Sequence, residues 1–234
     1  PASAADTVEI RSSFVNGTDF ATITAAADVE IGAADFAGFY YDVDDDISTE
    51  KIIIKDDSAD TKGLTIGKGD LVYTTEIKPT DYAFDAWGSF GIEGFFAQDY
   101  VPLAAGTPDK LSKLILDSDD KYTVRTGEKL DLGNGYALEA KQVDVDGNKV
   151  WIEFTADGEY VDDEVIDMDD EKNWTVDLDD IEDEDDVVVL KVHVNQVFQG
   201  AEDSIAQIDG LWLIDYANAM TIEDDDEFNL LDNV

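Results

Sequence analysis

The sequence has no cysteine, one histidine and two methionines among its 234 residues. Without cysteine the chain can form neither a disulfide framework nor a thiol active site. The single histidine, His193, cannot supply the several His or Cys ligands that a zinc site needs. Serine or cysteine catalysis also requires a histidine with an oriented neighbour, and nothing near His193 in the strand-like segment 191–195 suggests a nucleophile. We therefore expect His193 to be structural.

Basic residues are scarce as well: 15 Lys and Arg stand against 57 Asp and Glu, for a formal charge of −42. The excess is uneven, with −16 in residues 1–150 and −26 in residues 151–234. Such a field repels nucleic acid phosphates and anionic lipid headgroups, so neither is an expected partner. Two acids can hydrolyse a glycoside, but among 57 acids suitable pairs arise by chance. The sequence predicts no enzyme.

Long apolar runs are absent too. No stretch approaches the roughly 18 apolar residues of a membrane-spanning helix, and residues 1–10 lack the basic and apolar parts of a signal peptide. Because the chain begins at Pro1 and not at Met, we expect a processed or excised fragment. Any membrane attachment is then expected only through an anchor that this fragment does not contain.

Aromatic and β-branched residues are plentiful: eleven Phe, nine Tyr and four Trp accompany an apolar share of 44%. In residues 35–54 an aromatic run, an acidic corner and the triplet Ile52, Ile53 and Ile54 predict two buried strands joined at the surface. After residue 110, short strands alternate with turns at 133–135, 146–148 and 156–158, which is typical of β-sandwiches built from hairpins.

Further strands are predicted at 187–198, 208–214 and 219–222, whereas 162–186 is chiefly acidic with scattered apolar residues. No stretch carries a sustained helical period. We predict an all-β fold.

One acidic turn is a candidate cation site. Carboxylates gather in it, at Asp42, Asp44, Asp45 and Asp46. They lie close enough in sequence to bind Ca²⁺ or another divalent cation, the alternative being a solvated turn. Residues 144–148 imitate the start of a calcium loop, but the glycine comes one position early and Thr155 replaces the closing Glu, so we expect a hairpin turn. Residues 182–186 are interpreted as a solvated acidic face whose charges repel one another and other anions, or alternatively as a weak binding site for divalent cations. No other cofactor is predicted.

Two sequons are candidate glycosylation sites if the chain is exported. They begin at Asn16 and Asn173.

Several segments together carry a family resemblance. They are GFYYDVDDDISTEKIII, LVYTT, WGSFGIEGFFAQDYVPL, LSKLILDSDDKYTVRTGEKLDLGNGYALEAKQVDVDGNKVWIEFTADGEYVDD and VNQVFQGAEDSIAQIDGLWLID. In this order, from about Val8 to Phe228, they resemble the duplicated surface-layer (S-layer) domain of methanogenic archaea. The last third of the chain departs from the family in its small number of basic residues, which affects the net charge and not the assignment to the family.

The resemblance implies an exported structural glycoprotein at the cell surface. Family members carry two tandem copies of the domain, a spacer and a C-terminal membrane anchor, and this chain corresponds to one copy. Self-association into a porous two-dimensional lattice, including contact with the second copy, is implied as well. The family fold is two linked antiparallel β-sandwich domains. We place the first, discontinuous one at 1–116 with 200–234 and the second, hairpin-rich one at 117–199, with a simple cut near 110 as the fallback.

The predicted function is that of a structural subunit of a surface-layer lattice, a porous and negatively charged protective and permeability barrier. In it the acidic residues 162–186 would line a pore or an exposed face. The alternative is an extracellular adhesion or carbohydrate-binding β-sandwich module that uses exposed aromatics such as Trp87, Trp151, Trp174 or Trp212. A third interpretation, a soluble halophilic enzyme, predicts unfolding in low salt.

Overall fold

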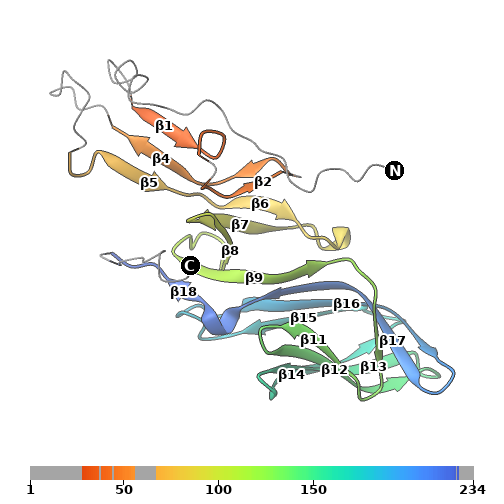
Figure 1. Ribbon diagram of the computed structural model, residues 1–234. Helices are drawn as coiled ribbons and strands as arrows, with labels where there is room; N and C mark the ends of the chain where they lie inside the picture. Colours follow the sequence, from red (N-terminus) through yellow and green to blue (C-terminus); the bar gives the residue numbers. More distant parts are fainter. Residues whose placement is uncertain (1–27, 37, 44, 56–66, 225, 227–234) are drawn as a thin grey trace, which may run out of the picture. The chain divides into compact units, whose positions relative to one another are not determined.

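The structure, a computed structural model, describes residues 28–36, 38–43, 45–55, 67–224 and 226 (Figure 1). Its regular elements are antiparallel strands and two 3-10 helices, so the predicted all-β class is confirmed. The chain divides into two compact units. Unit 1 comprises Pro1–Thr80 and Gly91–Tyr100, and unit 2 comprises Asp81–Phe90 and Val101–Val234. The chain passes between them inside three strands: β6 (Lys78–Asp81), β7 (Ser89–Phe95) and β8 (Gln98–Pro102).

Unit 1 contains a three-stranded sheet in the order β1-β4-β5, with bounds Val29–Gly32, Lys51–Ile54 and Leu71–Thr74. The isoleucine triplet forms a strand, as predicted, and this strand is the central one of the sheet. The predicted burial is confirmed only at Ile54, since Ile52 and Ile53 are half-buried. A two-stranded ribbon pairs β2 (Tyr41–Asp42) with β3 (Ile47–Ser48).

The hairpin of β7 and β8 turns at Phe96 and Ala97, whose φ angles are +49° and +69°. Two positive φ values in a two-residue loop suit the right-handed twist of the flanking strands.

A buried carboxylate holds this turn in place. Glu50, only 2% exposed, accepts hydrogen bonds from the backbone N–H groups of Tyr40 and Ala97 and from the hydroxyl of Tyr73. Next to it, the Thr49 hydroxyl accepts the N–H of Gly94 at 2.7 Å. A Cβ at position 94 would lie 2.7 Å from Thr49 Oγ1 and 2.9 Å from Glu50 Oε2, so the close approach requires glycine.

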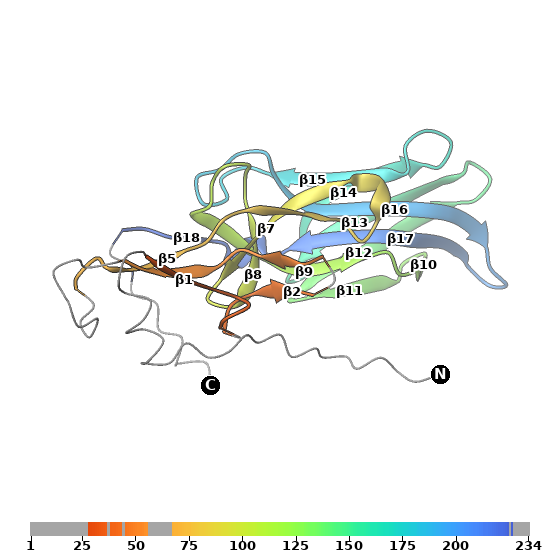
Figure 2. The same cartoon turned by 90° about the horizontal axis from the view of Figure 1, so that it is seen from above.

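Unit 2 consists of two facing sheets. One has the order β15-β16-β17-β9, with β10 also pairing with β17 and β18 with β9. The other has the order β11-β12-β13-β14. The bounds of these strands are β9 Lys110–Ser118, β10 Tyr122–Arg125, β11 Lys129–Gly133, β12 Tyr136–Asp144, β13 Lys149–Ala156, β14 Glu159–Asp167, β15 Asn173–Leu178, β16 Val187–Gln199, β17 Ser204–Ile214 and β18 Met220–Thr221. The 3-10 helices are η1 (Asp85–Trp87) and η2 (Tyr216–Asn218). The long strands β16 and β17 run side by side through the unit (Figure 2).

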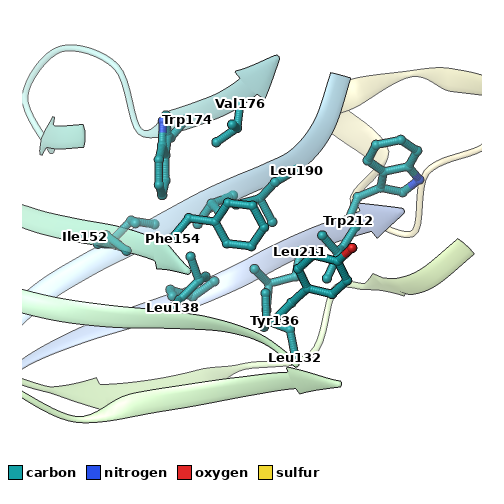
Figure 3. Close-up of a cluster of buried hydrophobic side chains, with 14 of the residues drawn as sticks. Leu132, Tyr136, Leu138, Ile152, Phe154, Trp174, Val176, Leu190, Leu211 and Trp212 are labelled. Carbon is teal, nitrogen blue, oxygen red and sulfur yellow. The ribbon is translucent and has the colours of Figure 1, made fainter. Parts of the chain in front are cut away.

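The core of unit 2 fills the space between the sheets (Figure 3). Alternate residues of β12 and β13, among them Leu138, Ile152 and Phe154, meet the buried side chains of Leu190 and Leu211. This alternation follows from the two-residue period of strands, which sends every second side chain to the same face. Burial of each such side chain contributes about 1.5–3 kcal/mol from the hydrophobic effect.

Several strand predictions in this unit are confirmed. The predicted strand at 187–198 is β16, and those at 208–214 and 219–222 correspond to β17 and β18. Residues 145–148 form the hairpin turn between β12 and β13, as expected from the failed calcium pattern. The strand expected after the turn at 156–158 is the start of β14, but the sequence predicted neither the continuation of β14 into the acidic segment nor β15.

The domain division stays a prediction, because compactness does not test independent folding. Unit 2 joins β17, from 200–234, to β16 and β9, whereas the sequence-based division assigned 200–234 to the domain containing 1–116.

Candidate functional site

The acidic segment, residues 162–186, contains fifteen acids and a single base, Lys172. It runs through the end of β14, all of β15 and the loops that follow each strand. Its apolar side chains enter the core, since Ile166, Trp174 and Val176 are almost completely buried. The acids occupy the outward positions between them. The segment is therefore a folded acidic surface of unit 2. The alternation of Trp174, Val176 and Leu178 is the sequence pattern from which β15 could have been predicted.

The loop of residues 179–186 is held to the rest of unit 2. Lys110 Nζ lies 2.7 Å from Glu184 Oε1, and this hydrogen bond raises the pKa of the lysine. Thr221 Oγ1 donates to Glu182 Oε2 at 2.7 Å. Four non-glycine residues of the loop have φ between +48° and +61°: Asp180, Glu182, Asp183 and Asp186. Asp visits this conformation more readily than most residues, so the acidic composition suits the turn geometry.

A cleft of about 440 Å³ opens between β14 and β15. It is lined by four acids and by residues of the second sequon: Glu164, Val165, Ile166, Asp167, Asp170, Glu171, Asn173, Trp174 and Thr175. Lys149 Nζ is bonded to Asp167 Oδ2 at 2.7 Å, and this bond lowers the pKa of the Asp167 carboxyl. The cleft is thus anionic at neutral pH, and anionic ligands would be repelled from it.

The sequon residue Asn173 begins β15 and is exposed. The indole N–H of Trp87 donates to Asn173 Oδ1 at 2.9 Å. The Trp87 ring also lies over Lys191 Nζ, 5.2 Å from the ring centroid. Glycosylation of Asn173 stays a prediction, and the other sequon residue, Asn16, lies outside the described residues.

The acidic corner at 42–46 has local hydrogen-bond partners. Asp42 Oδ1 accepts the N–H of Asp45 at 3.3 Å, and Asp45 Oδ2 accepts the hydroxyl of Thr80 at 3.0 Å. Asp46 Oδ1 accepts the hydroxyl of Tyr41. Asp44 lies outside the described residues. Among the residues that the structure describes, no three His, Cys, Asp or Glu side chains form a group that could hold a metal ion. The cation site, which includes Asp44, stays a prediction.

His193 joins two strands and an aromatic side chain. Its Nδ1 lies 2.6 Å from Asp209 Oδ1, and its ring stacks on Phe84 at a centroid distance of 4.4 Å. Gly210 allows this approach, because a Cβ there would lie 2.9 Å from the Phe84 ring. These contacts fix β16 against β17, which is a packing role.

The tryptophans differ in exposure. Trp174 and Trp212 are buried in the core, so neither can act as a surface platform for sugars. Trp151 is 38% exposed, and its indole N–H donates to Asp163 Oδ2 at 2.7 Å. The hydroxyl of Tyr160 donates to Oδ1 of the same carboxylate at 2.6 Å, and this bond raises the pKa of Tyr160 to about 12.

No helix in the described part of the chain combines the length and the apolar character needed to cross a membrane.

Comparison with known proteins places this architecture in a family. Residues 21–233 match the family described as S-layer protein. The chain is 61% identical to the major S-layer protein of Methanosarcina acetivorans and 58% identical to those of Methanosarcina barkeri and Methanosarcina mazei. Each match covers 100% of this chain but only 35–36% of the relative, so the chain spans about a third of their length. The chain belongs to the S-layer protein family, whose members are structural, non-enzymatic proteins of the cell surface.

Proposed function

We propose that this chain is a module of a surface-layer lattice, which forms a porous, negatively charged protective and permeability barrier around the cell. The observation that carries the proposal is the match over residues 21–233 to the S-layer protein family, together with 61% identity to a major S-layer protein. Because the chain covers about a third of that relative, assembly into the lattice, contact with a second tandem copy and anchoring to the membrane are all parts of the proposal.

In the proposed architecture the module consists of two linked β-sandwiches. The facing sheets of unit 2, with their shared core, support one sandwich. The sheet β1-β4-β5 and the hairpin of β7 and β8 support the other in unit 1. Such β modules suit a layer that must keep fixed openings, because the hydrogen-bonded ladders between their strands hold each sheet together.

The acidic segment is the proposed source of charge selectivity. Its exposed acids are Glu164, Asp169, Asp170, Glu171, Asp177, Asp179, Asp180, Glu182, Asp183, Asp185 and Asp186. In physiological salt the field of such a surface extends about 8 Å. Across an opening of nanometre size the fields of opposing walls overlap, so anions are repelled and cations concentrated. The acidic segment would line such an opening or face the medium.

Location is tested by immunogold electron microscopy of intact Methanosarcina cells with antibody against this chain. We expect dense, regular labelling of an ordered surface sheet. Cytoplasmic label would overturn the proposal. A few scattered surface spots would overturn it as well and would favour the adhesion function.

Charge selectivity is tested in sheets reconstituted from the full-length protein. The triple variant Asp170→Asn, Asp177→Asn and Asp183→Asn removes three exposed charges of the acidic segment. A matched control, Asp119→Asn, Asp120→Asn and Asp146→Asn, removes three exposed charges elsewhere in unit 2. We expect the passage of an anionic dye, relative to a neutral dye of equal size, to rise in the first variant more than in the control. Equal passage in wild type and both variants would refute a selective role for the segment.

A further inference from the structure

The sequon at Asn173 has an unusual setting, because it lies in a regular strand beside a cleft. Oδ1 of Asn173 is bonded to the indole of Trp87 at 2.9 Å, which fixes the orientation of the amide. Within the described residues Nδ2 of Asn173 makes no hydrogen bond. Nδ2 is the atom to which an N-linked glycan is attached. The amide is thus held by the oxygen that glycosylation leaves unchanged.

The cleft begins at the same residue. Asn173 and Thr175, the first and third residues of the sequon, both line it, and β14 supplies the opposite wall. Its volume of about 440 Å³ lies within the range of about 300–1,000 Å³ that is usual for small-molecule sites. A group attached to Asn173 therefore starts at the cleft and has room within it.

The lining of the cleft offers the chemistry that sugars need. Carboxylates at Glu164, Asp170 and Glu171 are strong acceptors for sugar hydroxyl groups. The Val165 side chain, 53% exposed, provides an apolar patch for the C–H face of a ring. The N–H of Val165 donates to Oε1 of Glu164 at 3.0 Å, which holds this carboxylate against β14.

We infer that the cleft between β14 and β15 holds the first sugars of a glycan attached to Asn173. The inference rests on the proposed glycosylation of Asn173 and specifies where that glycan lies. The sugars seated there are uncharged, because acidic sugars would be repelled by the four carboxylates. Their hydroxyl groups donate to the carboxylates, and the covalent link removes most of the entropy cost of binding.

The test uses two substitutions at one position in the full-length protein, produced in a Methanosarcina host. Thr175→Ala destroys the sequon but leaves Asn173 and its bond to Trp87 intact. Thr175→Ser keeps the sequon and is the matched control. Peptide mass spectrometry measures the mass added at Asn173, and hydrogen–deuterium exchange measures amide protection in residues 162–168. A third variant, Glu164→Gln with Glu171→Gln, weakens the wall without touching the sequon.

We expect added mass at Asn173 in wild type and Thr175→Ser but not in Thr175→Ala. Amide exchange in 162–168 should be roughly twofold to tenfold slower in the glycosylated forms, the range that one net hydrogen bond accounts for. The Glu164→Gln, Glu171→Gln variant should keep the added mass and lose part of the protection.

Two results would overturn the inference, and they are distinguishable. Absence of added mass at Asn173 in wild type would refute both the attachment of a glycan and its position in the cleft. Added mass with identical exchange in wild type and Thr175→Ala would refute only the position in the cleft, because the glycan would then extend into solvent.

Discussion

The two units of the chain bury different kinds of side chain. Among the described residues, unit 1 buries six apolar and three polar or charged side chains, whereas unit 2 buries 28 apolar and three polar or charged ones. Unit 2 is therefore stabilised chiefly by the hydrophobic effect, which does not depend on protonation. Unit 1 depends in part on hydrogen bonds to the buried carboxylate of Glu50. The same chain thus combines a largely apolar core with a second one that relies in part on hydrogen bonds to a buried carboxylate.

All four tryptophans of the sequence belong to unit 2, so the unfolding of the two units can be followed separately. Tryptophan fluorescence consequently reports the unfolding of unit 2, whereas hydrogen–deuterium exchange in residues 71–74 and 93–100 reports unit 1.

The largest effect is expected from Phe154→Ala in unit 2. Phe154 is completely buried between the two sheets, so its loss removes apolar burial and leaves a cavity, at about 3–5 kcal/mol in the free energy of unfolding. Urea unfolding followed by tryptophan fluorescence measures this. The control, Val165→Ala on the exposed side of the same sheet, should stay within about 0.5 kcal/mol. Equal effects of the two variants would contradict a core in this position.

Glu50→Ala should lower the stability of unit 1 by roughly 3 kcal/mol, because it leaves buried donors without their charged acceptor. Faster exchange in 93–100, with an unchanged tryptophan transition, is the expected result. Glu30→Ala is the control, since its pairing with Lys51 at 3.6 Å is exposed and worth at most about 1 kcal/mol. If tryptophan fluorescence and amide exchange reported the same loss in the free energy of unfolding, the two units would unfold together, which would contradict their separate stabilities.

A matched pair of tyrosines sharpens the comparison. Tyr73 in unit 1 donates to Glu50 at 2.7 Å and accepts the N–H of Phe96, whereas Tyr136 in unit 2 donates to Asp215 at 3.1 Å and accepts the N–H of Ala217. Either Tyr→Phe substitution should cost about 1 kcal/mol. Exchange should report the loss at Tyr73 and tryptophan fluorescence the loss at Tyr136.

The same tyrosines predict the alkaline limit of stability. Burial raises the pKa of both phenols above the ordinary value of about 10. A group whose pKa is higher in the folded state contributes stability below its unfolded pKa and loses it as pH rises further. The thermal midpoint should therefore fall above about pH 10, and less steeply in the Tyr73→Phe, Tyr136→Phe double variant. An equal fall in both proteins would assign the effect to other groups.

The smallest effect concerns the surface pair of Tyr160 and Asp163. The hydrogen bond to Asp163 raises the pKa of Tyr160 to about 12, so Asp163→Ala should return it towards the ordinary value of about 10. Nuclear magnetic resonance of the ring carbons during an alkaline titration measures the shift. A pKa that stays near 12 in the variant would show that Asp163 is not its cause.

The strands of unit 2 were largely predictable because local pattern and tertiary position agree. Period-two alternation and Gly-containing turns marked the hairpin of β12 and β13 in unit 2, and in unit 1 the isoleucine triplet marked β4. The continuation of β14 into the acidic segment and the whole of β15 were missed, because acids dominate the composition there while only alternate positions, such as Trp174 and Val176, enter the core.

Composition could not single out the important polar residues. Glu50 is one of 57 acids, and its burial arises from contacts with residues 40, 73 and 97, which are distant in sequence. The cleft beside Asn173 depends likewise on β14 and β15, strands of two different sheets, lying next to each other. Such sites follow from tertiary geometry, which a pattern of single residues does not encode.

The edge of strand β14 bears on whether copies of this chain aggregate when they are packed closely together. Among the described strands it has a hydrogen-bonded partner on one side only, and five of its nine residues are acids: Glu159, Asp162, Asp163, Glu164 and Asp167. Unpaired strand edges normally invite strands from other molecules, which is how fibrils begin. Two β14 strands placed edge to edge would set these carboxylates about 5 Å apart across the new pair. The acids thus oppose aggregation through this edge, also at the high local concentration of the proposed surface sheet.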